Sequence, residues 1–164
     1  MTTATRQATE TTHAERNGRG WIDDISANHE AWEFCTEQGR TLYKLEGRNL
    51  SREARAVLHQ HGFDGDNHQD VADDIEQTMR EGVLDVQVRS GWQASDEHLE
   101  AAQFQILLTT GGPALRLIGD LEDGEPSRSW FEIQDWGTPW TGLHCQHSYE
   151  IHAKDWFASL FFFG

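Results

Sequence analysis

The chain has 164 residues, of which 37% are hydrophobic, and its 28 acidic and 13 basic side chains give a formal net charge of −15. A charge of this size repels nucleic acid and anionic membranes and attracts basic surfaces, so direct binding to DNA, RNA or a bilayer is disfavoured. The sequence has no long apolar run, so no membrane span is expected, and two cysteines are too few for a disulfide framework. We therefore expect a compact protein in the cytoplasm of a prokaryotic cell.

The N-terminal half predicts helices. Residues 1–20 lack the apolar run of a signal peptide and are expected to form a disordered leader. In residues 21–38, apolar side chains recur at helical spacing with His29 among them, which we interpret as a packed histidine, and carboxylates line the adjacent face. The apolar set is Ile22, Ile25, Trp32 and Cys35, and the acidic set is Glu30, Glu33 and Glu37. Gly39 then predicts the end of this helix.

Two further helices are predicted in the same region. The first covers residues 51–61 and has Ser51 as its N-cap. The second covers residues 69–81 and has one apolar face and one acidic face, formed by Val71, Ile75 and Met79 and by Asp70, Asp73 and Asp74 respectively. Asp70 and Asp74 would lie ~6 Å apart along the helix axis, similar to neighbouring phosphates on one DNA strand. Residues 21–82 are thus predicted to be an acidic helical region.

The hydrophobic pattern then changes to a period of two. In residues 83–89 the apolar side chains Leu84, Val86 and Val88 share one face, which predicts a strand with one side in water. Three more strands are predicted over 104–108, 114–121 and 129–135, and the short turns between them favour antiparallel neighbours. The fold class is therefore α+β. We expect a four-stranded antiparallel meander over about residues 83–135, with Trp92 folded back onto it.

A last helix is predicted over residues 148–163, beginning at Ser148 and docking its aromatic side on the sheet. That side consists of Tyr149, Trp156, Leu160 and Phe163. The Phe-rich end is too apolar to lie in water, so it either fills the core or supplies a homodimer or partner contact. Residues 83–164 are expected to form one compact unit with residues 21–82.

Few patterns predict chemistry. His144, Cys145 and His147 lie near His152, but their spacing is not that of a structural zinc site, and no activated nucleophile or phosphate-binding loop is indicated. We therefore expect no cofactor, no metal and no catalysis. Residues 135–140 predict a rigid aromatic corner. It is either a structural cover for the sheet end or a recognition surface built on Asp135, Trp136 and Trp140.

Three motifs stand out in the C-terminal half. They are Arg89-Ser90-Gly91-Trp92, Gly111-Gly112-Pro113-Ala114 and Gln134-Asp135-Trp136-Gly137-Thr138-Pro139-Trp140-Thr141. With the aromatic ending before Gly164, they resemble a family of small, largely uncharacterised proteins carried by phages, plasmids and integrative elements. The resemblance covers about residues 83–164. It implies no reaction, but it implies an accessory protein of a mobile element, a class that often acts against host defences such as CRISPR and restriction systems.

Charge and resemblance together lead to two functional hypotheses. The first is an anti-defence protein, most concretely an anti-CRISPR inhibitor that mimics DNA, binds the basic nucleic-acid-binding surface of a CRISPR effector of the Cascade type and blocks target DNA. Its expected contacts are Glu30, Glu33, Glu37, Asp70, Asp73 and Asp74. The alternative is a non-enzymatic regulatory or scaffold module that binds a protein through the Trp136/Trp140 corner, with the acidity serving solubility.

Overall fold

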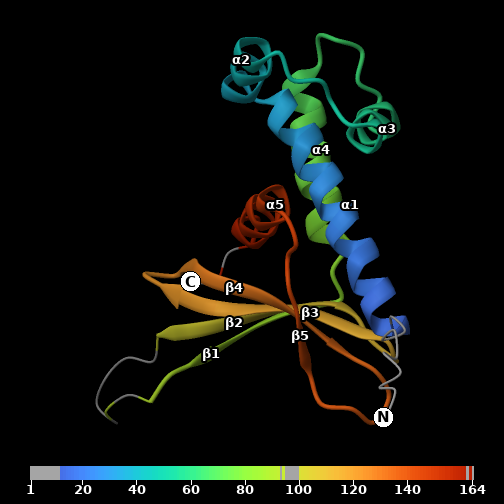
Figure 1. The fold of residues 1–164 in the computed structure, drawn as a ribbon. Helices are drawn as coiled ribbons and strands as arrows, with labels where there is room; N and C mark the ends of the chain where they lie inside the picture. Colours follow the sequence, from blue (N-terminus) through green and yellow to red (C-terminus); the bar gives the residue numbers. More distant parts are fainter. Residues whose placement is uncertain (1–11, 93, 95–99, 162, 164) are drawn as a thin grey trace, which may run out of the picture.

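The protein is an α+β fold in which five helices lie on one side of an antiparallel sheet (Figure 1). A computed structural model describes residues 12–92, 94, 100–161 and 163. The helices are α1 (His13–Cys35), α2 (Glu37–Glu46), α3 (Arg52–Gln60), α4 (His68–Glu81) and α5 (Ser148–Ser159). The strands are β1 (Asp85–Ser90), β2 (Ala101–Thr109), β3 (Ala114–Glu122), β4 (Glu125–Gln134) and β5 (Thr141–Leu143). Within these described ranges, no helix is long and apolar enough to cross a membrane.

The sheet confirms the predicted antiparallel meander, but it contains five strands rather than four. The order is β1-β2-β3-β4-β5, and every neighbouring pair is antiparallel. The fifth strand covers only three residues and pairs Leu143 with Phe131. A strand this short shows no alternation of its own, and its pairing depends on β4, so the sequence pattern did not reveal it.

α1 begins at His13, eight residues before the predicted start at Trp21. Thr12 and Glu15 form a capping box, in which each side chain accepts the backbone N–H of the other at 3.2 and 2.8 Å. The early turns are also anchored by burial of Ala14 and Gly18. Residues 13–20 of the expected leader are therefore helical, and residues 1–11 lie outside the described part of the chain.

α2 is not predicted from the sequence, because Gly39 is a residue that commonly ends a helix. Gly39 instead lies in the first turn of α2, where its N–H donates to Thr36 Oγ1 at 3.0 Å. A Cβ at this position would lie 1.8 Å from the carbonyl oxygen of Glu33. The glycine therefore permits the close approach of two consecutive helices.

The core lies between the helices and the covered face of the sheet. The predicted apolar face of α4, consisting of Val71, Ile75 and Met79, is buried, as are Ile22 and Ile25 of α1. From the sheet they meet fully buried side chains that alternate along the strands, which are Phe104, Ile106, Leu108, Leu115, Leu117 and Phe131. Burying such side chains contributes roughly 1.5–3 kcal/mol each.

α5 ends at Ser159, four residues before the predicted end, and it packs against α1 and β4. Trp156 and Phe157 are buried, whereas Tyr149, expected on the docked side, is exposed. Phe163 lies beyond the helix and is buried, with its ring 4.5 Å from the ring of Phe104. Of the two alternatives for the Phe-rich end, the structure therefore shows Phe163 in the core.

β1 differs from the expected strand with one wet side, because both of its faces are exposed. Val86 and Val88 pair with Ile106 and Phe104, so they point to the same side of the sheet as the core. They remain exposed because no helix covers this edge. Trp92 was expected to fold back onto the sheet, but it is fully exposed.

Gly119 provides a test of how tightly this sheet is packed. A Cβ at Gly119 would lie 2.1 Å from the carbonyl oxygen of Arg128 and 2.7 Å from the Phe104 ring. We expect Gly119→Ala to lower the free energy of unfolding by about 1–3 kcal/mol, because the clash involves backbone and a buried ring. Gly20→Ala is the matched control, since no atom lies within 4 Å of its Cβ position. It should raise stability by about 0.5–1 kcal/mol. Urea unfolding measures the free energy of unfolding of both variants. An equal change in the two variants would contradict the close packing at Gly119.

Candidate functional site

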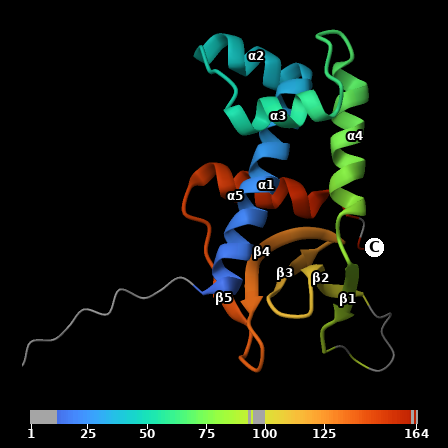
Figure 2. The ribbon, with the colours of Figure 1, turned by 90° about the vertical axis from the view of Figure 1, so that its right-hand side faces the viewer.

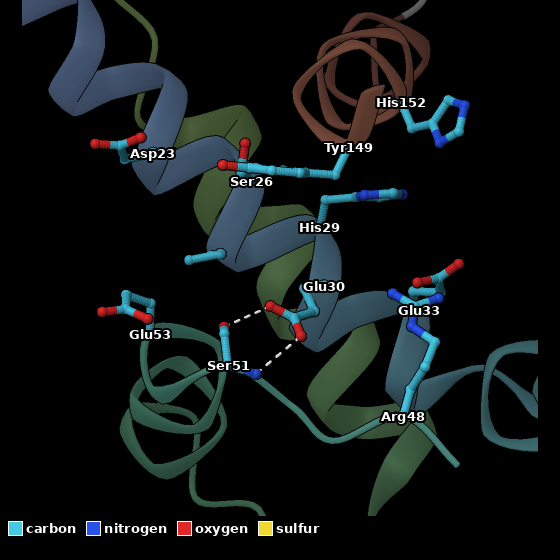
Figure 3. A pocket seen from close by; sticks show the side chains of 11 residues that line it. Asp23, Ser26, His29, Glu30, Glu33, Arg48, Ser51, Glu53, Tyr149 and His152 are labelled. Carbon is cyan, nitrogen blue, oxygen red and sulfur yellow. Dashed lines mark hydrogen bonds between the residues drawn. The ribbon is translucent and has the colours of Figure 1, made fainter. Parts of the chain in front are cut away.

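A pocket of about 530 Å³ opens between α1, α5 and the segment that leads into α3 (Figure 3). α1 supplies one wall through residues at helical spacing, and the other walls come from segments far apart in sequence. The lining residues are Asp23, Ser26, Ala27, His29, Glu30, Glu33, Arg48, Ser51, Glu53, Tyr149 and His152. The pocket thus includes the predicted contact residues Glu30 and Glu33.

Glu30 holds the N-terminus of α3 in place. Its carboxylate accepts the backbone N–H of Ser51 at 2.9 Å and also the Ser51 hydroxyl (Figure 3). Ser51 Oγ in turn accepts the Ala54 N–H at 3.0 Å, which confirms Ser51 as the predicted N-cap. Tyr43 also donates its hydroxyl to Glu30 at 3.4 Å, and burial beside this carboxylate raises the pKa of Tyr43 to about 12. Glu30 is therefore a structural acceptor rather than an unoccupied surface charge.

The remaining charges make the pocket electronegative. Asp23, Glu33 and Glu53 line it without any ion pair to the described residues. Arg48 is the one basic residue in the lining, but it already pairs with Glu46 at 3.7 Å and lies over the Tyr43 ring at 4.5 Å. A cation, rather than an anion, suits such a pocket.

His29 forms the aromatic side of the pocket together with residues of α5. Its ring lies 5.2 Å from the ring of Trp156 and 6.0 Å from that of Trp32, which agrees with a packed histidine. Burial, and to a smaller extent the nearby His152, lower the pKa of His29 to about 4 against the opposing effect of Glu30. Tyr149 reaches across from α5 towards Ser26 (Figure 3). Burial, Glu150 and Asp23 raise the pKa of Tyr149.

The other predicted acidic residues lie outside this pocket. Asp70, Asp73 and Asp74 are exposed on α4, which lies behind α1 when seen from the pocket (Figure 3). Asp73 accepts a hydrogen bond from Gln69 at 2.8 Å. Glu37 is exposed in the first turn of α2. The structure thus divides the predicted carboxylates between two sides of α1 and does not gather them into one face.

The aromatic corner lies at the end of the molecule opposite α2 and α3 (Figures 1 and 2). Asp135 is half-buried and begins a turn closed by the Thr138 N–H, which donates to the Asp135 carbonyl at 3.1 Å. Trp136 is 81% exposed and packs over Gly112. Trp140 lies under Arg116, whose guanidinium carbon is 4.1 Å from the ring centroid. Trp140 is therefore tied to the sheet, and Trp136 is the tryptophan of this corner that a partner can reach.

The weak zinc candidates do not converge. Among the described residues, no group of three or more His, Cys, Asp or Glu side chains could hold a metal ion. The His147 ring stacks on Tyr149 at 5.2 Å, and the backbone carbonyl of His144 accepts a hydrogen bond from Arg19. Burial raises the pKa of the Cys145 thiol, which disfavours the thiolate that a nucleophile requires.

Most of the pocket residues were not identified from the sequence. On α1, the spacing of Asp23, Ser26, Glu30 and Glu33 is a helical signal that could have been found. The path of the chain after α2 brings three further residues into the pocket, which are Arg48, Ser51 and Glu53. The docking of α5 brings in Tyr149 and His152. Comparison with protein families, with characterised proteins and with solved structures found no match.

The low pKa of His29 predicts a defined pH dependence of stability. The unfolded chain takes up this proton near pH 6.5 and the folded chain near pH 4. The contribution of neutral His29 to the free energy of unfolding is therefore complete above pH 6.5 and is lost as the pH falls towards 4. Over this range the free energy of unfolding changes by at most about 1.4 kcal/mol per pH unit because of His29. We expect His29→Gln to flatten the change in unfolding free energy between pH 7 and pH 4.5. His59→Gln, at an exposed position on α3, is the control and should leave the slope unchanged.

Proposed function

We propose that this chain is a non-enzymatic inhibitor from a mobile element that binds a basic nucleic-acid-binding surface through its carboxylates. Its most concrete target is a CRISPR effector of the Cascade type, whose DNA site it would occupy. The exposed carboxylates of α4, the net charge of −15 and the resemblance of the C-terminal motifs favour this proposal. The raised pKa of the Cys145 thiol does not favour this cysteine as a nucleophile.

The observation that carries the proposal is the row of carboxylates along α4. Asp70, Asp73, Asp74 and Glu81 are all exposed, and none forms an ion pair within the part of the chain that the structure describes. On this helix only Glu76 is paired, with Arg80 at 3.2 Å. A row of unneutralised charges raises the local negative potential, which speeds encounters with a basic surface.

The pocket supports the same function in a different way. It is large enough for a long side chain, and Asp23, Glu33 and Glu53 would surround a cationic group there. Tyr149 and His29 provide an apolar wall for the methylene part of such a side chain. We propose that a lysine or arginine of the partner enters this pocket as a second contact, on the other side of α1 from the acidic row of α4.

Charge reversal on α4 tests the proposal. The double substitution Asp70→Lys with Asp74→Lys should slow association with a purified effector about 10-fold or more at low salt and restore target-DNA binding. Gel-shift assays of the effector with its target DNA measure the inhibition, and stopped-flow measurements give the rate.

Glu122→Lys with Glu125→Lys is the matched control for this experiment. The two residues face each other across the β3–β4 turn, and their replacement makes the same change in net charge on the sheet. The control should retain inhibition. Equal losses in both variants would mean that only the total charge matters, and full inhibition by the α4 variant would refute this interface.

A second candidate function is favoured by the exposure of Trp136, which is 81% accessible although aromatic residues of this size are usually buried. In this case the protein is a regulatory or scaffold module that binds through the corner. Trp136→Ala should then weaken partner binding by about 2 kcal/mol or more, and the binding should persist at high salt. Trp140→Ala is less decisive, because it also removes the contact with Arg116. Binding that is unaffected by Trp136→Ala would exclude this function.

A further inference from the structure

The exposed apolar side chains of this protein concentrate at one edge of the sheet. β1 is the edge strand, and its outer side has no partner strand within the described chain. Leu84, Val86 and Val88 are 57%, 36% and 49% exposed, and Trp92, just past the strand, is fully exposed. Ten large hydrophobic residues are exposed in the described part of the chain, and these are four of them. The β1 edge is therefore the main exposed apolar patch of the described residues. Edge strands with these properties are templates for pairing with another chain.

The sequence of β1 is complementary to itself when read in the opposite direction. In an antiparallel pair centred on Gln87, Asp85 of one copy faces Arg89 of the other, and Val86 faces Val88. Both charge pairs are satisfied at once, because a two-fold axis repeats each contact. The strand is also locally neutral, since Asp85 and Arg89 cancel, although the whole chain carries −15. Opposite charges and β-branched residues facing each other across strands are stabilising pairs.

The backbone donors suit the same register. The Val86 N–H donates to the carboxylate of Asp85 in its own chain at 2.9 Å, so this donor is not used in the pairing with β2 and faces the open edge. Two residues on, Val88 has the same orientation along the strand. In the register centred on Gln87, Val86 and Val88 of opposite copies would exchange their N–H and carbonyl groups. Asp85 would then release Val86 and turn to Arg89 of the second copy.

The shape of the helical layer also permits the pairing. Val86 and Val88 point to the helix side of the sheet, yet they are exposed, so the helices end short of this edge. Figure 2 shows β1 at the margin of the sheet. The opposite edge is β5, which has only three residues and so offers a short template. Pairing of β1 with itself closes after two copies, whereas pairing of β1 with β5 would continue into a filament.

We propose that two copies of this chain associate through β1 in this register, forming one continuous antiparallel sheet of two joined five-stranded sheets. The apolar row of each copy then packs against the row of the other. This inference does not depend on the proposed function, because it rests on the edge strand alone.

A charge-swap cycle tests both the dimer and its register. Asp85→Arg places Arg opposite Arg89, and Arg89→Asp places Asp opposite Asp85, so each single variant should raise the dimer dissociation constant about 10-fold. The double variant restores opposite charges and should return the constant to within about 3-fold of the original. Within one chain these two residues are separated by about 13 Å along the strand, so the rescue can only be intermolecular.

Sedimentation equilibrium of the full chain over a wide concentration range gives the dissociation constants, and circular dichroism confirms that each variant is folded. A dimer that the single variants weaken and the double variant rescues supports the proposal. A chain that stays monomeric at every concentration overturns it. If the single substitutions leave the dimer dissociation constant unchanged, or if the double variant does not restore it, the proposed β1 register is wrong.

Discussion

The packing of α1 against both layers is the constraint on which the rest of the structure depends. This one helix contacts α2, α3, α4 and α5, and also β3 and β4. Its first turns approach the sheet so closely that a Cβ on Gly18 would lie 2.4 Å from the Leu143 side chain. Its later turns carry Glu30 and His29, which position α3 and α5. The pocket and the direction of the acidic face of α4 both follow from where this helix lies.

The acidic residues of the chain have two distinct roles. Some are used inside the fold: Glu150 is buried, pairs with Arg19 at 3.6 Å and accepts the backbone N–H of His147. Glu132 similarly binds Arg116 at 2.6 Å on the open face of the sheet. Others, such as Asp70 and Asp74, have no such partner among the described residues. Repulsion among these unpaired charges opposes the compact state, so they do not stabilise the isolated chain. They serve either a contact with another molecule or solubility.

Much of the fold followed from the sequence because periodicity is a local signal. The stripe of Val71, Ile75 and Met79 and the antiparallel meander were both predicted correctly. Features that depend on contacts distant in sequence were not. α2 was missed because Gly39 allows close packing instead of ending a helix, and β1 was assigned one buried face although no helix reaches it. The same limit applies to the site: the acidic residues of α1 were identifiable, but no pattern places Ser51 or Tyr149 beside them.

The bond between Glu30 and Ser51 links occupancy of the pocket to local unfolding. The Glu30 carboxylate accepts the N–H and the hydroxyl of Ser51, whose Oγ caps α3, so a cation that draws Glu30 away leaves this cap residue without its acceptor. Losing such a cap costs about 1 kcal/mol, which would appear as faster amide hydrogen exchange in α3 while the rest of the core stays protected. Ligands that leave Glu30 in place avoid this cost. The fold therefore favours cations that bind to Asp23, Glu33 and Glu53 while the bond between Glu30 and Ser51 stays intact.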